Sequence, residues 1–312
     1  MLVSYQASAP GSLMLLGEHA VLHGEKALVC ALSKRITVTL LPRTDQQIVI
    51  RSDKGSFTTQ LNQLAVTKPL QFVLGALVHY RANLQTGCEL VIESEFSDQV
   101  GLGSSAAVTV ATVAVIRAWL SYSMDKNELT NAAIAVIRAV QGLGSGADVA
   151  AAVYGGMIAY CAQPLQVETF SQLHPLTVVY SGYKTPTVEV VKHVQNTFAA
   201  CPDILQRICL RIGACTQQAI QLLRAGRITA CGEIMNRQQG LMEELGVSNP
   251  LLNKLVAYLC QQSTISGAKI SGSGLGDCVI GWGKSDNLIF IENGVCSISV
   301  DMSAQGVLVF AE

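Results

Sequence analysis

The segment Gly101-Leu102-Gly103-Ser104-Ser105-Ala106 combines residue types that suit the binding of a phosphate group. An alternating strand pattern over 88–96 precedes it, and an Ala- and Val-rich helix pattern over 106–120 follows it. Glycines let the backbone come close to a ligand, and the free N–H groups of a helix start attract anions. A plain strand-to-helix turn is the alternative, but the paired serines at the helix start favour phosphate binding.

Two polar residues follow a buried strand near the N-terminus. The apolar segment 13–16 predicts that strand, and Gly17-Glu18-His19 comes directly after it. His19 and His23 are four residues apart, but no glutamate stands between them as in the zinc motif His-Glu-x-x-His. We therefore predict that Glu18 and His19 face a substrate and hold no zinc.

Asp148 follows a second Gly-Leu-Gly-Ser turn, at residues 142–145, and falls in the first turn of a short Ala-rich helix pattern. An acidic residue there can simply balance the helix dipole. Because its neighbours are Gly, Ala and Val, the carboxylate could instead accept a proton or hold a metal. The helix start predicts a lowered pKa, and hence a weak base that acts mainly by orientation.

A third Gly/Ser-rich turn contains Gly272-Ser273-Gly274.

Several other nucleotide-binding and catalytic motifs can be excluded. Residues 101–106 also fit the dinucleotide fingerprint Gly-x-Gly-x-x-Ala, but the strand-rich segment before them lacks a β-α-β unit. The Gly-x-x-x-x-Gly-Lys-Ser/Thr loop, the protein-kinase motifs and the serine-hydrolase motif Gly-x-Ser-x-Gly are absent from the sequence.

The composition is that of a globular protein, because half of the 312 residues are hydrophobic and 14% are charged. A net charge of −1 without a run of Lys or Arg argues against a nucleic-acid partner. The apolar helix pattern over 106–120 is too short to span a membrane. The ten scattered cysteines and an N-terminus unlike a signal peptide predict reduced thiols and a cytoplasmic protein.

Strands and long helices alternate irregularly, which predicts an α+β fold with two domains, residues 1–170 and 171–312. Pro10-Gly11 predicts a turn between two strands. The predicted strands are 2–9, 13–16, 27–41, 47–51, 88–96, 157–161, 176–180, 279–282, 288–292 and 297–302. The predicted helices are 70–81, 106–120, 128–141, 188–199, 203–224, 228–245 and 249–262, with a short helix around Asp148.

Three motifs in this order resemble those of the GHMP small-molecule kinases: Pro10–Gly24, Val100–Ala107 and Lys269–Cys278, with Gly144–Asp148 between the second and third. The run Gly17–Gly24 is most similar to the mevalonate kinases of that family. The resemblance implies an N-terminal ATP-binding domain like domain 2 of ribosomal protein S5 and a ferredoxin-like C-terminal domain, with the site between them.

The resemblance also implies roles for the residues of these motifs. ATP phosphates would lie in the 101–106 loop and Mg²⁺ at the Ser105 hydroxyl. Asp148 would be the active-site carboxylate, and Glu18 and His19 would contact the substrate. The turn that holds Gly272, Ser273 and Gly274 would close over the phosphates.

Two positions depart from the family pattern. The first motif of the family usually reads Pro-Gly-Lys, and its lysine partners the catalytic aspartate, whereas this chain has Ser12. A second Mg²⁺ ligand, a glutamate in mevalonate kinases, is replaced by Ile137. The segment 181–187 resembles one that reaches the active site in the family, so we add Lys184 as a catalytic cation and Thr187 as a substrate contact, and keep Ser12 in the catalytic set.

The motifs and the resemblance together imply ATP-dependent phosphorylation of the primary alcohol of mevalonate. Phosphomevalonate kinase is an alternative, because the ending Gly276-Asp277-Cys278 is similar to that branch, although no basic cluster provides for a phosphorylated substrate. A binding or regulatory protein that has lost catalysis is a second alternative, which the departures at Ser12 and Ile137 suggest. The predicted partners are ATP and a small hydroxylated acid, without nucleic acid or membrane, and a homodimer is left open.

Overall fold

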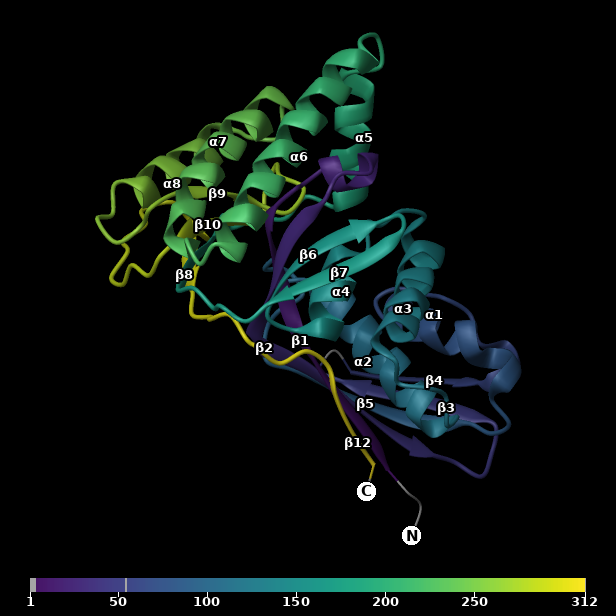
Figure 1. Ribbon diagram of the computed structural model, residues 1–312. Coiled ribbons are helices and arrows are strands. Elements are labelled where there is room, and N and C mark those ends of the chain that lie inside the picture. The colour runs from purple at the N-terminus through teal and green to yellow at the C-terminus, as the bar shows by residue number, and fades with distance from the viewer. Residues whose placement is uncertain (1–3, 54, 312) are drawn as a thin grey trace.

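The computed structural model describes residues 4–53 and 55–311, which form two domains, each built on one β-sheet (Figure 1). The larger sheet has eight strands and the smaller sheet has four. Most strand pairs are antiparallel, and the helices do not alternate regularly with the strands. The predicted α+β class is therefore confirmed.

The larger sheet has the strand order β12-β1-β2-β5-β3-β4, and β6 joins it on β2 and carries β7. Strands β3 and β5 pair in parallel. The last strand of the chain pairs with the first, so both ends of the described chain meet in this sheet. Its strands are β1 (Tyr5–Leu16), β2 (Ala27–Pro42), β3 (Gln47–Ser52), β4 (Gly55–Gln60), β5 (Cys88–Ser94), β6 (Met157–Ala162), β7 (Leu165–Phe170) and β12 (Leu308–Ala311).

The α-helices of this domain, within the described residues, are α1 (Gln71–Tyr80), α2 (Ser104–Trp119), α3 (Lys126–Gln141) and α4 (Ala147–Tyr154). Helix α2 packs on β1 and β2 and is surrounded by the other three helices. This central position explains why its sequence is rich in Ala and Val on every side rather than along one stripe. The N-terminal end of α2 is thereby held firmly where the predicted phosphate loop meets it.

The smaller sheet has the order β11-β8-β10-β9 and is antiparallel throughout. Figure 1 shows its helices grouped together at the top of the view. The strands are β8 (Leu176–Tyr180), β9 (Ala268–Ser271), β10 (Cys278–Trp282) and β11 (Cys296–Ile298), and the helices are α5 (Thr187–Thr197), α6 (Pro202–Arg224), α7 (Cys231–Glu244) and α8 (Pro250–Cys260).

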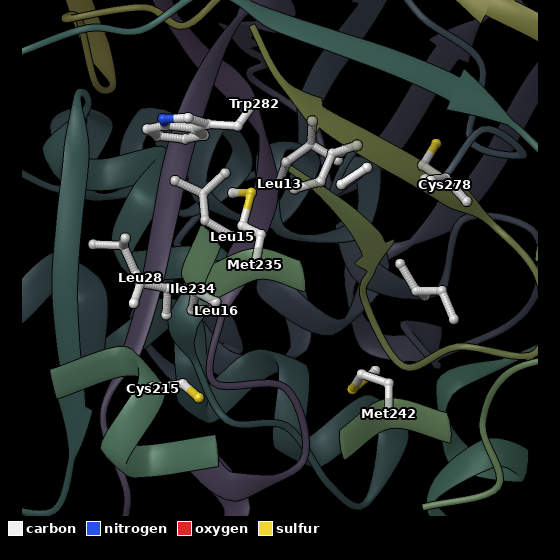
Figure 2. Packing of buried hydrophobic residues seen from close by; sticks show 14 of the residues in the cluster. Leu13, Leu15, Leu16, Leu28, Cys215, Ile234, Met235, Met242, Cys278 and Trp282 are labelled. Atoms are coloured by element: carbon white, nitrogen blue, oxygen red, sulfur yellow. The ribbon is translucent and has the colours of Figure 1, made fainter. Parts of the chain in front are cut away.

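The two domains share part of one hydrophobic core, which fixes their relative position. Figure 2 shows leucines of β1 and β2 beside residues of α7 and β10. Leu15 and Leu28 are fully buried in this cluster together with Met235 and Trp282. Each such side chain contributes about 1.5–3 kcal/mol by leaving water, so the walls of a cleft between the domains are well supported.

Several strands differ from the prediction, and the strand predicted at 297–302 ends at Ile298. Pro10-Gly11 is not a turn, because β1 continues through it with a register shift between Pro10 and Ser12 that indicates a bulge. Residues 288–292 form no strand: Ile289 is 78% exposed, and its N–H bonds the Tyr258 hydroxyl rather than a neighbouring strand. Strands β4, β7, β9 and β12 were not predicted, and residues 2–3 of the first predicted strand lie outside the described residues.

Candidate active site

A cleft of about 210 Å³ brings most of the predicted site residues together between the domains. Leu102 and Gly274 do not line it: Leu102 is 1% exposed in the core, and Gly274 packs against Val247. The predicted residues that line the cleft are Ser12, Glu18, His19, Gly101, Gly103, Ser104, Ser105, Ala106, Asp148, Lys184, Thr187, Gly272 and Ser273.

The predicted phosphate loop is held against β1. Gly103 precedes α2 in the left-handed region, with φ of 69°, and no side chain caps the start of that helix. The Ser12 N–H donates to the Leu102 carbonyl at 3.0 Å. A Cβ on Gly103 would lie 2.1 Å from Ser12 Oγ, so only glycine fits this approach. The first residues of α2 line the cleft, where the free N–H groups of a helix start can bind an anion.

Asp148 lies in the first turn of α4 and accepts a 2.8 Å hydrogen bond on Oδ1 from the Ser12 hydroxyl. Burial raises the pKa of Asp148, while this hydrogen bond and the charge of Lys184 partly offset the increase. The predicted lowering of this pKa is wrong, because loss of solvent outweighs the helix start. The raised pKa makes Asp148 a better proton acceptor than the sequence suggested.

Glu18 is part of a buried contact between the two domains. Its side chain is 1% exposed and forms an ion pair with Lys269 of β9, whose side chain is fully buried. The Gln238 amide of α7 donates to the other Glu18 oxygen at 2.5 Å and accepts from the Gly17 N–H at 3.1 Å. Burial raises the pKa of Glu18 and lowers that of Lys269, and their attraction opposes both shifts. Both carboxylate oxygens are therefore already engaged within the protein.

His19 directly follows Glu18 in the chain and has an unusual positive φ of 59°. Its Nε2 lies 2.8 Å from the Ser273 carbonyl of the opposite domain. A carbonyl oxygen can only accept, so Nε2 carries the proton. Burial lowers the pKa of His19, which favours the neutral ring and leaves Nδ1 as an acceptor.

Lys184 and Thr187 enter the cleft from the smaller-sheet domain. Thr187 is the first residue of α5, and Lys184 lies in the turn before that helix. Lys184 is exposed, and its Nζ donates to the Asp98 carbonyl at 3.1 Å. The ammonium group therefore stands at the mouth of the cleft, beside the loop that leads into α2.

A second cavity of about 760 Å³ adjoins the first. Both cavities are lined by Ser104, Ser105 and Lys184, so they meet at the start of α2. The larger cavity also has apolar walls that include Leu70 and Phe72. A nucleotide base in the larger cavity and an acceptor in the smaller one would place the phosphates where the two meet.

Sequence reasoning missed Asp277, which also lines the smaller cleft. Asp277 is 7% exposed and has a positive φ of 62°. Burial raises its pKa to about 6, and the charge of Lys184 opposes that shift. The sequence signal that could have identified Asp277 is its position as an acidic residue at the end of a Gly-rich turn. Ile137 also lines the cleft, which places an apolar side chain where the family pattern has a metal ligand.

The oxygen donors in the cleft fit a cation that arrives with a nucleotide better than a resident metal. Over residues 4–53 and 55–311, no group of three or more His, Cys, Asp or Glu side chains is arranged as a metal site. Ser105, Asp148 and Asp277 nevertheless all line the cleft, and hydroxyl and carboxylate oxygens suit Mg²⁺. Phosphate oxygens would supply the remaining ligands, as is usual for this ion.

Comparisons with known proteins agree with this geometry. Residues 71–156 match the model of the GHMP kinases N terminal domain, and residues 219–297 match that of the GHMP kinases C terminal domain. A mevalonate kinase of Pyrococcus abyssi is 31% identical over 294 residues, covering 88% of this chain and 87% of the relative. A mevalonate kinase of Archaeoglobus fulgidus is 33% identical over 282 residues, covering 90% of this chain and 93% of the relative.

Solved structures of mevalonate kinases share this fold. The crystal structure of the Methanococcus jannaschii mevalonate kinase superposes with a TM-score of 0.77 at 21% identity, covering 95% of this chain and 98% of that one. This likeness supports the two-domain arrangement. Within the described part of the chain, none of the helices is long and apolar enough to cross a membrane.

Proposed function

Since the chain belongs to the GHMP kinase family of ATP-dependent kinases, we propose that it transfers the γ-phosphoryl group of ATP to the primary alcohol of mevalonate. The observation that carries this proposal is the meeting of two cavities at Ser104, Ser105 and Lys184, with Asp148 in the smaller one. The mevalonate kinases among its relatives support mevalonate as the acceptor.

The proposed reaction depends mainly on position and charge. ATP would lie in the larger cavity with its phosphates at the start of α2, where the N–H groups of residues 103–106 are available. Lys184 lines both cavities and would balance charge at the γ-phosphate. The Ser105 hydroxyl would help to hold a Mg²⁺ ion, which supplies further charge neutralisation when bound.

Asp148 would accept the proton of the acceptor alcohol. The Ser12 hydrogen bond fixes one of its oxygens and leaves the other available. Its raised pKa improves its strength as a base at neutral pH. Ser12 carries no charge, so it would orient the carboxylate at the position where the family motif usually has a lysine, and the cation would come from Lys184.

The lining of the smaller cleft favours an acceptor with a short hydrocarbon skeleton over one that already carries a phosphate. Ile137, Leu143 and Val149 give it an apolar side that suits a branched methyl group. Its acidic residues include Asp148 and Asp277, which would repel a phosphorylated acceptor. Mevalonate carries only one carboxylate, so it fits this balance better than phosphomevalonate.

The test is ATP turnover with a panel of acceptors: mevalonate, phosphomevalonate and galactose, each at saturating ATP. We expect turnover with mevalonate at least tenfold above the others, as a specific cleft provides. Faster turnover with phosphomevalonate would reassign the acceptor. Intact ATP binding without turnover of any acceptor would instead identify a binding protein.

We also propose the cytoplasm as the compartment of this reaction. All ten cysteines are free thiols, which suits a reducing environment. Cys30, Cys88 and Cys278 are among the buried ones, and burial raises their pKa values, so they remain unreactive thiols.

A further inference from the structure

We propose that Asp277 is a ligand of the divalent cation that accompanies ATP, and that it supplies from the smaller-sheet domain the second protein ligand that Ile137 cannot provide. The proposal rests on ATP binding in the cleft, as proposed above, but it does not depend on which acceptor is phosphorylated.

The first observation is a buried carboxylate oxygen without a partner. Asp277 is 7% exposed, and its Oδ1 forms no hydrogen bond among the described residues. Buried polar atoms nearly always have a partner, because leaving one unpaired is unfavourable, and more so for a charged group. Asp277 lines the cleft, so a bound group in the cleft can supply what the protein does not.

The second observation is how firmly the backbone holds Asp277 in place. Its N–H donates to the Tyr183 carbonyl and its carbonyl accepts from the Ser181 N–H, both at 2.9 Å. Its φ of 62° belongs to the left-handed region, which aspartate adopts more readily than most residues other than glycine. The turn that carries Lys184 thus fixes the backbone of Asp277 beside the cleft.

The third observation is that this carboxyl group lies against the phosphate loop. A Cβ on Gly101 would be 3.0 Å from Cγ of Asp277. A carboxylate at that place would repel the phosphates of ATP unless a cation lay between them. Mg²⁺ accepts carboxylate and phosphate oxygens together, so one ion would satisfy both.

The two lysines near the cleft do not neutralise the negative charge of Asp277. Lys184 is near enough to influence Asp277, but it brings a single positive charge to a cleft with two carboxylates, Asp148 and Asp277. Lys269 is also close to the cleft, but it is buried and paired with Glu18. Asp148 and Asp277 therefore leave the cleft with excess negative charge before the triphosphate adds more, which calls for a divalent cation.

The test measures metal binding rather than activity. Mn²⁺ serves as the probe, and its affinity for the complex of the protein with the ATP analogue AMP-PNP is measured by electron paramagnetic resonance. Asp277→Asn should weaken Mn²⁺ binding roughly tenfold or more, because a charged oxygen ligand is lost. Affinity for metal-free ADP should stay equal or improve, because the repulsion disappears. If Asp277 had a purely structural role, its replacement would not weaken Mn²⁺ binding while leaving ADP binding equal or stronger.

The variants are chosen to preserve the fold. Asparagine tolerates the left-handed conformation, and Asp277→Gly accepts it without strain, so the second variant keeps the test available if the first is unstable. Asp301→Asn is the matched control, because Asp301 is exposed, pairs with Lys284 at 3.3 Å and does not line the cleft. It should leave Mn²⁺ affinity unchanged.

Unchanged Mn²⁺ affinity in a folded Asp277→Asn or Asp277→Gly protein would overturn the proposal and leave the proposed kinase function intact. Failure of the wild-type protein to bind AMP-PNP with Mn²⁺ would overturn both. The two proposals can therefore fail separately in one set of titrations.

Discussion

The hydroxyl of Ser12 donates a 2.8 Å hydrogen bond to Oδ1 of Asp148. This contact joins the first strand of the chain to the start of α4, and it lies in the cleft beneath the loop before α2. A neutral donor at this place orients the carboxylate without lowering its pKa as strongly as a lysine would. We therefore expect the base, Asp148, to come from the larger-sheet domain and the compensating positive charge, Lys184, to come from the smaller-sheet domain.

Asp148→Asn tests the proposed base. The amide keeps an oxygen to accept from Ser12 but cannot take up a proton, so kcat should fall by about 10²-fold or more with ATP affinity preserved. Rapid-quench kinetics and calorimetric titration measure the two quantities. Asp125→Asn is the control, since Asp125 caps α3 through the Asn127 and Glu128 N–H groups far from the chemistry. A kcat within a few-fold of wild type would reduce Asp148 to a helix-start residue.

Lys184→Ala tests the proposed cation. Because Lys184 lines both cavities, its loss should lower kcat by about 10²-fold and change nucleotide affinity little. Ser12→Lys should partly restore activity to this variant, since it returns a charge beside Asp148. Single-turnover kinetics on the two single variants and the double variant measure the coupling. Full activity in Lys184→Ala would assign the charge to the helix start and the metal alone.

Local sequence signals predicted much of this arrangement, because glycines and helix starts act over a few residues. The loop before α2 and the helix that carries Asp148 were predicted from such patterns. The ion pair between Glu18 and Lys269 could not be predicted, since it joins residues 251 positions apart. Glu18, predicted to contact substrate, lines the cleft, and both of its oxygens bond within the protein.

Strand β9 and the position of Asp277 also depend on contacts between residues far apart in the sequence, which local patterns do not predict. Strand β9 was missed because its four residues stand beside a Gly-rich turn, and only pairing with β10 defines it. Asp277 was noticed only as a feature of a motif. Its unpaired oxygen and its contact with Gly101 depend on how the two domains close, which no local pattern encodes.

Gly103→Ala tests the phosphate loop. The new Cβ would meet Ser12 Oγ at 2.1 Å, so the loop must move and ATP affinity should fall at least about tenfold, or 1.4 kcal/mol. Gly142→Ala is a matched control, because Gly142 also has a positive φ, of 76°, with no atom within 4 Å of an added Cβ. It should cost about 1 kcal/mol of stability and leave ATP binding unchanged. Equal ATP affinities in both folded variants would contradict the phosphate assignment.

Lys269→Met tests the buried ion pair. Removing one partner leaves the Glu18 carboxylate buried without its cation, which should lower the free energy of unfolding by about 3–5 kcal/mol. The double variant Glu18→Gln with Lys269→Met should recover much of this loss, because no buried charge remains. Urea denaturation of the three variants gives the coupling energy. If Lys269→Met is as stable as wild type, the pair does not hold the domains together.

His19→Gln tests the neutral state of the buried histidine. Burial lowers the pKa of His19 in the folded protein below its ordinary value of 6.5. The unfolded chain therefore binds more protons below pH 6.5, so the stability that the neutral ring contributes is complete above that pH and is lost as the pH falls. Proton uptake by the unfolded state limits this loss to about 1.4 kcal/mol at pH 5.5.

Glutamine can still donate to the Ser273 carbonyl but does not titrate in this range. The drop in unfolding free energy between pH 7.5 and pH 5.5 should therefore be smaller in His19→Gln than in wild type. Any backbone strain that glutamine suffers at this positive φ affects both pH values equally and cancels in the comparison. His79 and His174, whose pKa values burial also lowers, leave the same residual dependence in both proteins. Urea denaturation of both proteins at the two pH values makes the measurement, and identical drops would mean that His19 is protonated alike in the folded and unfolded states.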